Sequence, residues 1–283
     1  MTATPAAAPA PDRNAPAATS LDADRDVSAS AVFGALLRRD LRVARRELPY
    51  FLVRTLMQPV LFIIVFGFLL PKMGFVRGGY TTALLPGIIA VSLALSAVQA
   101  VALPMVQDFG WTREIEDRLL APVPTPLIAS EKVVAGALQG ILSALVVLPI
   151  ARLIMGPIQG LSVAHILPFV AVTALGAVTF SALGLLMGTA IAPQQIGLMF
   201  SIIIAPMLMF GCAYYPWRGL DRVPAMKYLV LVNPLVYVAE GMRGAITPDV
   251  PHMPIVASAT ALVVLAGGFW FWGRRTFLRK ALG

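Results

Sequence analysis

The charged residues of one short stretch are the best candidates for a functional site in this sequence. Five of them stand within six positions: Arg113, Glu114, Glu116, Asp117 and Arg118. Groups three and four residues apart share a helix face and can form ion pairs, while Ile115, Leu119 and Leu120 form an apolar face. Prolines at positions 122, 124 and 126 then end the helix. We expect a short amphipathic helix at about residues 109–121, with a binding role rather than a catalytic one.

This predicted helix has two interpretations. It is either a solvated loop that returns the chain to the next apolar run, or a surface that docks on a cytosolic partner protein. A plain return loop needs no apolar face, so the pattern favours docking.

The sequence offers no catalytic or metal-binding constellation. His165 and His252 stand alone, and Cys212 is the only cysteine, so neither a zinc-protease motif nor an intramolecular disulfide can form. The phosphate-binding loop of ATPases requires a lysine that directly follows a glycine. None of the four lysines does so: Lys72, Lys132, Lys227 and Lys280. The sequence argues against an enzyme, and an ATP-driven activity requires a separate ATPase subunit.

The composition indicates an integral membrane protein. The 283 residues are 58% hydrophobic and only 13% charged, with a mean hydropathy of +0.82, whereas soluble domains carry roughly 25% charged residues. The formal net charge of +8 does not indicate nucleic-acid binding, because the basic residues stand at the ends of apolar runs, as membrane topology requires. The expected partner of most of the surface is therefore the lipid bilayer of the cell membrane.

The N-terminal part divides into a tail and a basic helix. Residues 1–30 are mainly Ala, Pro, Ser, Thr and Asp and lack the apolar core of a signal peptide, so we expect a disordered cytoplasmic tail. From residue 31 to 50, apolar residues recur at helical spacing and Arg38, Arg42, Arg45 and Arg46 fall on another face. This pattern predicts an amphipathic helix that lies along the membrane surface.

Six later segments are long and apolar enough to span a bilayer, which requires about twenty residues. They are residues 52–70, 84–106, 133–155, 166–192, 196–213 and 255–272. The sequence thus predicts an all-α integral membrane protein with six transmembrane helices over residues 31–283. An even number of spans places both termini on one side, and the basic clusters near both ends make that side the cytoplasm.

The connection between the fifth and sixth spans, residues 214–254, is itself partly apolar. Its run "YLVLVNPLVYVAEGM" is too short to span and is broken by Asn233 and Pro234, so we expect a re-entrant or external helical hairpin. Glu240 and Arg243 are three residues apart and can form an ion pair near the outer interface. The pair either neutralises itself or takes part in gating, and the sequence leaves both roles open. We expect the aromatic residues at positions 214, 215 and 217 to lie at the interface.

Two of these motifs resemble those of the permease subunit of ATP-binding-cassette (ABC) type-2 exporters. The run "REIEDRLLAPVPTPLIASEK", residues 113–132, is similar to the segment that precedes the third span in that family, and "NPLVYVAEGMRGAI", residues 233–246, is similar to the signature before its last span. The resemblance covers nearly everything after the tail.

The resemblance implies roles for three segments. The basic N-terminal helix would be the connecting helix, residues 113–120 would be the coupling helix that docks into an ABC ATPase subunit, and residues 214–254 would form an external hairpin over the translocation path. ATP and magnesium would bind to the partner ATPase, with no cofactor in this chain. A second permease subunit, identical or related, would complete an exporter of drugs, lipids or glycans.

A secondary transporter or a membrane scaffold without an ATPase is the alternative. Ion-coupled carriers place ionisable residues inside the bilayer, and none of the six predicted spans contains Asp, Glu or His. Several uncharged polar residues remain to line a path or to bond between helices: Gln58, Ser96, Gln99, Gln139, Ser143 and Thr179. An uncharged polar path suits an amphipathic substrate better than an ion.

Overall fold

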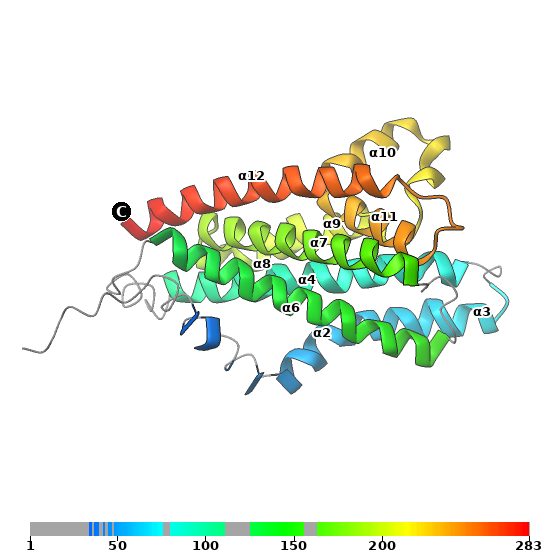
Figure 1. Ribbon diagram of the computed structural model, residues 1–283, viewed down its shortest axis with the longest axis horizontal. Helices are drawn as coiled ribbons and strands as arrows, with labels where there is room; N and C mark the ends of the chain where they lie inside the picture. Colours follow the sequence, from blue (N-terminus) through cyan, green and yellow to red (C-terminus); the bar gives the residue numbers. More distant parts are fainter. Residues whose placement is uncertain are drawn as a thin grey trace, which may run out of the picture.

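The computed structural model describes residues 34–35, 37–39, 42, 45–46, 48–75, 80–110, 125–155 and 163–282. Over these residues the chain is helical, with no strands, which confirms the predicted all-α class. Four long helices run along the length of the molecule (Figure 1): α4 (Tyr80–Gly110), α6 (Thr125–Met155), α7 (Val163–Ala190) and α12 (Ile255–Leu282). The predicted tail at residues 1–30 and the predicted coupling helix at residues 113–120 lie outside the described residues.

Shorter helical elements precede and follow α4, α6 and α7. Before α4, α2 (Leu48–Phe62) continues through a π-helical segment η1 (Ile63–Leu69) into α3 (Leu70–Lys72). After α7 come η2 (Pro193–Gln195), α8 (Ile196–Met199), the π-helical η3 (Phe200–Ile204) and α9 (Ala205–Met209). The next group is η4 (Trp217–Arg222), α10 (Pro224–Leu229), η5 (Val230–Val232) and α11 (Pro234–Ile246).

Four helices of the described residues are long and apolar enough to cross a membrane: Tyr80–Gly110, Pro126–Met155, His165–Ala190 and Ile255–Ala281. They match four of the six predicted spans. The other two predicted spans contain shorter apolar helices, Leu56–Lys72 and Pro193–Met209. A bent pair, Pro224–Val232 and Pro234–Ile246, meets the same test as a unit and is bent by 102°. By length and composition, the described residues therefore contain four candidate spans, or five if the bent pair is one broken span.

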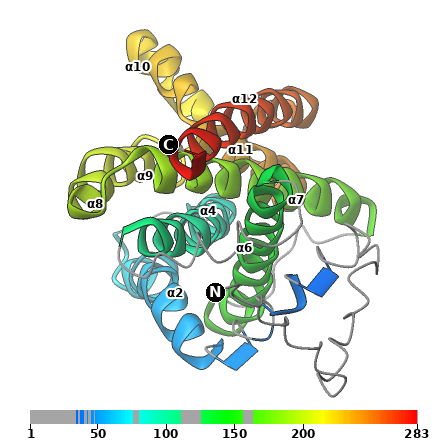
Figure 2. The same cartoon turned by 90° about the vertical axis from the view of Figure 1, so that its left-hand side faces the viewer.

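Helix α4 is the centre of the bundle. It packs against α7, α6, α11 and α2, and Figure 2 shows it surrounded by these helices while α8, α9 and α10 lie at the periphery. Of its most apolar part 72% is buried, compared with 11% for α12, which leaves α12 a largely exposed outer face. Exposed apolar side chains on such a helix are suited to contact with lipid.

Small residues bring the central helices close together. A Cβ atom added at Gly140 of α6 would lie 2.9 Å from the Cβ of Ala97 in α4, and one added at Gly184 of α7 would lie 2.8 Å from the carbonyl oxygen of Val98. Close approach through small residues is the usual way helices pack in membranes, where no hydrophobic effect drives them together.

Hydroxyl groups add polar contacts between helices of the bundle. The hydroxyls of Ser92 and Ser143 lie 2.6 Å apart, Ser96 donates to the carbonyl oxygen of Gln139 at 3.3 Å, and Thr179 donates to that of Leu262 at 3.2 Å. The sequence left open whether these residues line a path or bond between helices. The structure shows hydrogen bonds between helices.

Helices α4 and α6 are longer than the predicted spans, and the added turns bury charged residues. Asp108 lies in the last turns of α4, and Glu131 and Lys132 lie in the second turn of α6. Their exposed fractions are 8%, 0% and 6%. Hydropathy placed the span limits at positions 106 and 133, but a helix continues as long as its backbone is hydrogen-bonded and neighbouring helices cover it. The described helices thus contain buried ionisable residues that the span prediction excluded.

Candidate functional site

The bend between η5 and α11 is built by Asn233 and Pro234. The backbone of Asn233 is extended, and its side-chain oxygen accepts a hydrogen bond from the backbone N–H of Leu235 at 2.9 Å, which caps α11. Pro234 follows at the first helical position, where a missing N–H costs nothing. The Asn233 amide also donates to the carbonyl oxygen of Met207 at 2.6 Å, so the cap ties α11 to α9.

Helix α11 holds Glu240 and Arg243 in the interior of the protein. The exposed fraction of both side chains is 0%, because α11 packs against α4, α7 and α12. The spacing of three residues predicted an ion pair, and the pair is present. The pair is buried inside the protein, and its place near the outer membrane interface stays a prediction.

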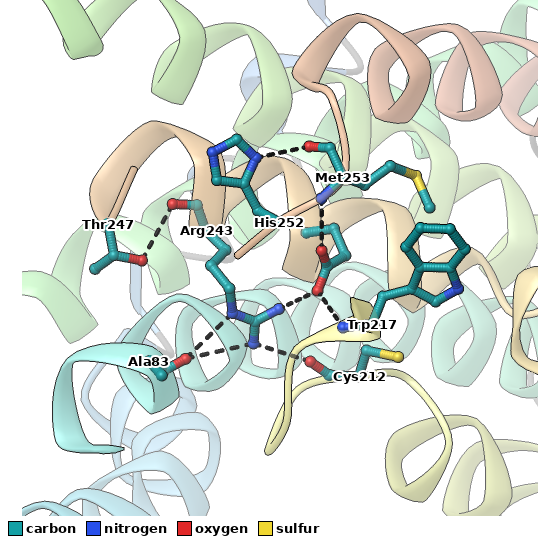
Figure 3. A network of polar contacts seen from close by, with 8 residues as sticks. Ala83, Cys212, Trp217, Arg243, Thr247, His252 and Met253 are labelled. Atoms are coloured by element: carbon teal, nitrogen blue, oxygen red, sulfur yellow. Dashed lines mark hydrogen bonds and ion pairs between the residues drawn. The ribbon is translucent and has the colours of Figure 1, made fainter. Parts of the chain in front are cut away.

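The Glu240 carboxylate accepts three hydrogen bonds from three parts of the chain (Figure 3). Its Oε1 accepts from Nη1 of Arg243 and from the backbone N–H of Trp217 at 2.9 Å, and its Oε2 accepts from the backbone N–H of Met253 at 2.8 Å. Trp217 begins η4, and Met253 lies just before α12. One carboxylate therefore fixes the starts of two elements to α11.

The guanidinium of Arg243 binds two backbone carbonyl groups on the opposite side (Figure 3). Its Nη2 donates to the carbonyl oxygen of Cys212 at 3.0 Å, and both Nε and Nη2 donate to that of Ala83 in the first turn of α4 at 3.3 Å. We call the set Ala83, Cys212, Trp217, Glu240, Arg243 and Met253 the Glu240–Arg243 network. It joins α4, the chain after α9, α11 and the start of α12.

The network has the chemistry of a structural contact that holds segments together, rather than that of a catalytic site. Both charges are buried, and buried charges are tolerated when they are paired and hydrogen-bonded, as these are. Within the described residues, no three His, Cys, Asp or Glu side chains are placed to hold a metal ion. The arrangement can therefore hold four segments in fixed relative positions, and a change in any of them must be felt by the others.

Cys212 contributes its backbone to the network. Its φ of +52° lies in the left-handed region, which side chains other than glycine rarely adopt, and this conformation accompanies a carbonyl group that accepts from Arg243. The sequence indicated only a small packing residue at this position. No local pattern predicts that the backbone carbonyl of Cys212 will accept a hydrogen bond from Arg243, which is 31 residues away.

The thiol of Cys212 is expected to be unreactive in the folded protein. The residue is 0% exposed, so a maleimide reagent has no access to the sulfur. We expect less than one tenth of the protein to be labelled in mild detergent, and complete labelling after denaturation in SDS, as read by mass spectrometry. Rapid labelling of the folded protein would show that the network opens under ordinary conditions.

The aromatic residues of the same connection make contacts within the protein, and their expected place at the membrane interface stays a prediction. The Tyr214 ring stacks on Phe62 of α2 at a centroid distance of 5.1 Å, and burial raises the pKa of its phenol to about 12. Tyr215 donates to the carbonyl oxygen of Met209 at 3.4 Å, and Trp217 donates through Nε1 to that of Lys227 at 3.0 Å. Their role is to join α2, α9 and α10 to the connection.

The predicted coupling residues are outside the described part of the chain, but the helices on either side of them are not. Helix α4 ends at Gly110 and α6 begins at Thr125, so residues 111–124 join these two central helices. The buried residues Asp108, Glu131 and Lys132 stand at this end, and each is engaged in an interaction. The predicted coupling residues are thus joined through the chain to the two helices α4 and α6.

Comparisons with known proteins identify similar sequences. A sequence model of the ABC-2 type transporter family matches residues 31–247. The inner membrane transport permease YadH of Escherichia coli strain K12 is 32% identical over 235 residues, which covers 77% of this chain and 85% of the relative. The permeases of the same name from Escherichia coli O157:H7 and Shigella flexneri match with the same identity and coverage.

Proposed function

This chain belongs to the ABC-2 type transporter family and is a multi-pass transmembrane permease of the cell membrane, and from this premise we propose that it is driven by a separate ABC ATPase and exports an amphipathic substrate. One observation carries the proposal. The family depends on ATP, and the sequence has no phosphate-binding loop of its own, because none of its lysines follows a glycine. The ATP and its magnesium ion then bind to the partner.

The ATPase docks on residues 111–124, with Arg113, Glu114, Ile115, Glu116, Asp117, Arg118, Leu119 and Leu120 as the contact. The charges set register and specificity, and the apolar side chains supply the buried area. The position of this segment between α4 and α6 supports the assignment, because force applied there acts on the two helices that form the core.

Two permease subunits form the complete pore, either identical or related. The fifth apolar segment supports this, because one of its faces packs into the core through Met199, Ile204 and Met207. Its other face leaves an apolar surface for a second subunit, with Leu198, Ile202, Met209 and Phe210 exposed. Together with α2, which continues into the π-helical η1, it forms the path. Such segments are frequent at functional sites.

The topology proposed for this permease has six spans, with the shorter apolar helices counted as spans one and five. Both termini are then cytoplasmic, and η4 to α11 forms a helical hairpin on the outer side. An amphipathic substrate suits the exposed face of α2, where Gln58 stands among the apolar side chains Met57 and Leu61. A drug, a lipid or a glycan meets this description.

The first test of the proposal is purification of the tagged chain in a gentle detergent. We expect a stoichiometric ATPase to co-purify and to show vanadate-sensitive ATP hydrolysis. If no ATPase is recovered but vesicles that contain the purified protein still transport a substrate, the protein is an ion-coupled carrier. If such vesicles do not transport a substrate either, the protein is a scaffold.

Reversal of two charges tests the docking segment. In the variant Glu114→Lys/Glu116→Lys, we expect recovery of the ATPase to fall at least tenfold, because like charges across an interface cost several times RT and spoil its register. The measurement is the ratio of ATPase to permease after purification.

The matched control makes the same charge change in the tail, with Asp22→Lys/Asp24→Lys, and should leave the ratio unchanged. Equal recovery of the ATPase with both variants would contradict docking at residues 113–120.

A further inference from the structure

The segment from η4 to η5, residues 217–232, projects from the side of the bundle. Figure 1 shows α10 beside the first half of α12, and Figure 2, seen along the bundle, shows it reaching outward past the other helices. We call residues 217–232 the projecting arm. It extends sideways from the helices rather than beyond their ends.

The projecting arm is a folded unit and not a loose loop. Lys227 forms an ion pair with Asp221 at 2.6 Å and lies over the ring of Trp217 at 4.5 Å. Trp217 in turn donates to Glu240 at 2.9 Å, so the base of the arm is fixed to the Glu240–Arg243 network. A small apolar cluster joins Val230 of the arm to Cys212 and Val236.

Part of the outer surface of the arm is apolar. Tyr228, Leu229 and Val232 are 68%, 64% and 80% exposed, and Val223 is also exposed. Apolar residues this accessible, grouped on one short segment, mark a surface that something else covers.

The charges of the arm identify what covers it. Arg218, Arg222 and Lys227 are positive and Asp221 is negative, which leaves two positive charges in excess. Asp221 is already occupied by Lys227, and neither arginine, both of them exposed, has a carboxylate partner among the described residues. The arm thus presents two cations next to an apolar surface.

We infer that the projecting arm binds anionic phospholipid, with Arg218 and Arg222 at the headgroup phosphates and Tyr228, Leu229 and Val232 in the upper acyl region. This combination of basic and apolar side chains is the one that holds segments at the surface of anionic membranes. A second copy of the chain is a poorer occupant, because two copies of the arm would bring like charges together. The inference requires only that the chain lies in a membrane, and it holds whether or not an ATPase drives transport.

A fluorescent probe on the arm tests this inference in the full-length protein. Leu229→Cys is labelled with an environment-sensitive dye, since the native thiol at position 212 is buried. The protein is placed in vesicles of neutral phosphatidylcholine, or of phosphatidylcholine with about one third phosphatidylglycerol, each with a lipid that carries a quencher high in its acyl chain. We expect stronger quenching in the anionic vesicles.

Removal of the arginines gives the decisive comparison. Each basic residue near an anionic surface shifts a binding equilibrium about fivefold, so Arg218→Gln/Arg222→Gln should reduce the equilibrium constant for lipid binding by roughly 25-fold. Quenching then falls to the value seen in neutral vesicles. The matched variant Arg274→Gln/Arg275→Gln removes two exposed arginines from α12 and should have no effect.

Three outcomes would overturn the inference. Equal quenching in both kinds of vesicle would show that anionic lipid is not bound. A probe that is shielded from water but not quenched by lipid would show that protein, such as a second copy, covers the arm. A probe as exposed as one at Asp249→Cys, in a polar turn outside the arm, would show that nothing covers it.

Discussion

Replacement of Arg243 with methionine is expected to destabilise the folded protein by about 3–5 kcal/mol, the usual cost of removing one partner from a buried ion pair. Methionine has a similar volume but no donor, so the Glu240 charge would stay buried without its cation. The carbonyl groups of Ala83 and Cys212 would also lose their partner. The measurement is the free energy of unfolding in mixed detergent micelles, and Arg275→Met, at an exposed position of α12, is the control.

A charge swap distinguishes the fastening role from simple neutralisation. In Glu240→Arg/Arg243→Glu the two charges still cancel, but a carboxylate would face the carbonyl groups of Ala83 and Cys212, and a guanidinium would face the N–H groups of Trp217 and Met253. We expect no recovery of stability, because donors would face donors and acceptors would face acceptors. Recovery by the swap would show that only the net charge matters.

Replacement of Gly87 with alanine is expected to have a comparably large effect for a steric reason. A Cβ atom at this position of α4 would lie 1.7 Å from the carbonyl oxygen of Ala213 and 2.4 Å from its carbon. These are backbone atoms that cannot rotate away. The free energy of unfolding should therefore fall by more than is typical of an overpacked core, which is about 1–3 kcal/mol. Thermal unfolding in detergent should report a clear drop for this one added methyl group.

Glycines in α12 give the matched comparison. A Cβ atom at Gly267 or Gly268 meets nothing within 4 Å, and alanine in a helix is favoured over glycine by about 0.5–1 kcal/mol. Gly267→Ala should therefore raise the unfolding temperature slightly, while Gly87→Ala lowers it. A similar change at both positions would mean that α4 does not approach residue 213 as closely as described.

The sequence predicts the helices of this protein better than their contacts. Hydropathy located α4, α6, α7 and α12 because each is a long, uninterrupted apolar run. It placed the limits of α4 and α6 too early, because charges such as Glu131 end an apolar run without ending a helix. Predicted spans one and five correspond to shorter apolar helices, Leu56–Lys72 and Pro193–Met209, and each of these contains a π-helical segment.

The sequence predicted one contact of the candidate site but not the others. The spacing of Glu240 and Arg243 predicted their pairing, since residues three apart meet on a helix. Their other partners carry no signal in the sequence. Ala83 is 160 residues from Arg243 and contributes only a carbonyl group, which every residue has. A contact made by the backbone of a distant residue depends on the tertiary fold, so local sequence patterns cannot predict it.

The length of α4 has a mechanical consequence. Its 31 residues extend over about 46 Å at 1.5 Å per residue, with Gly110 beside residues 111–124 at one end and Ala83 in the Glu240–Arg243 network near the other. A tilt of only about 5° around one end of such a rod carries the other end through roughly 4 Å. Hydrogen bonds of 3.0–3.3 Å, such as those of Arg243, do not survive a displacement of that size. A small tilt of α4 would thus leave the hydrogen bonds of Arg243 in place. A larger tilt would either move the residues of the Glu240–Arg243 network together with α4 or break these hydrogen bonds.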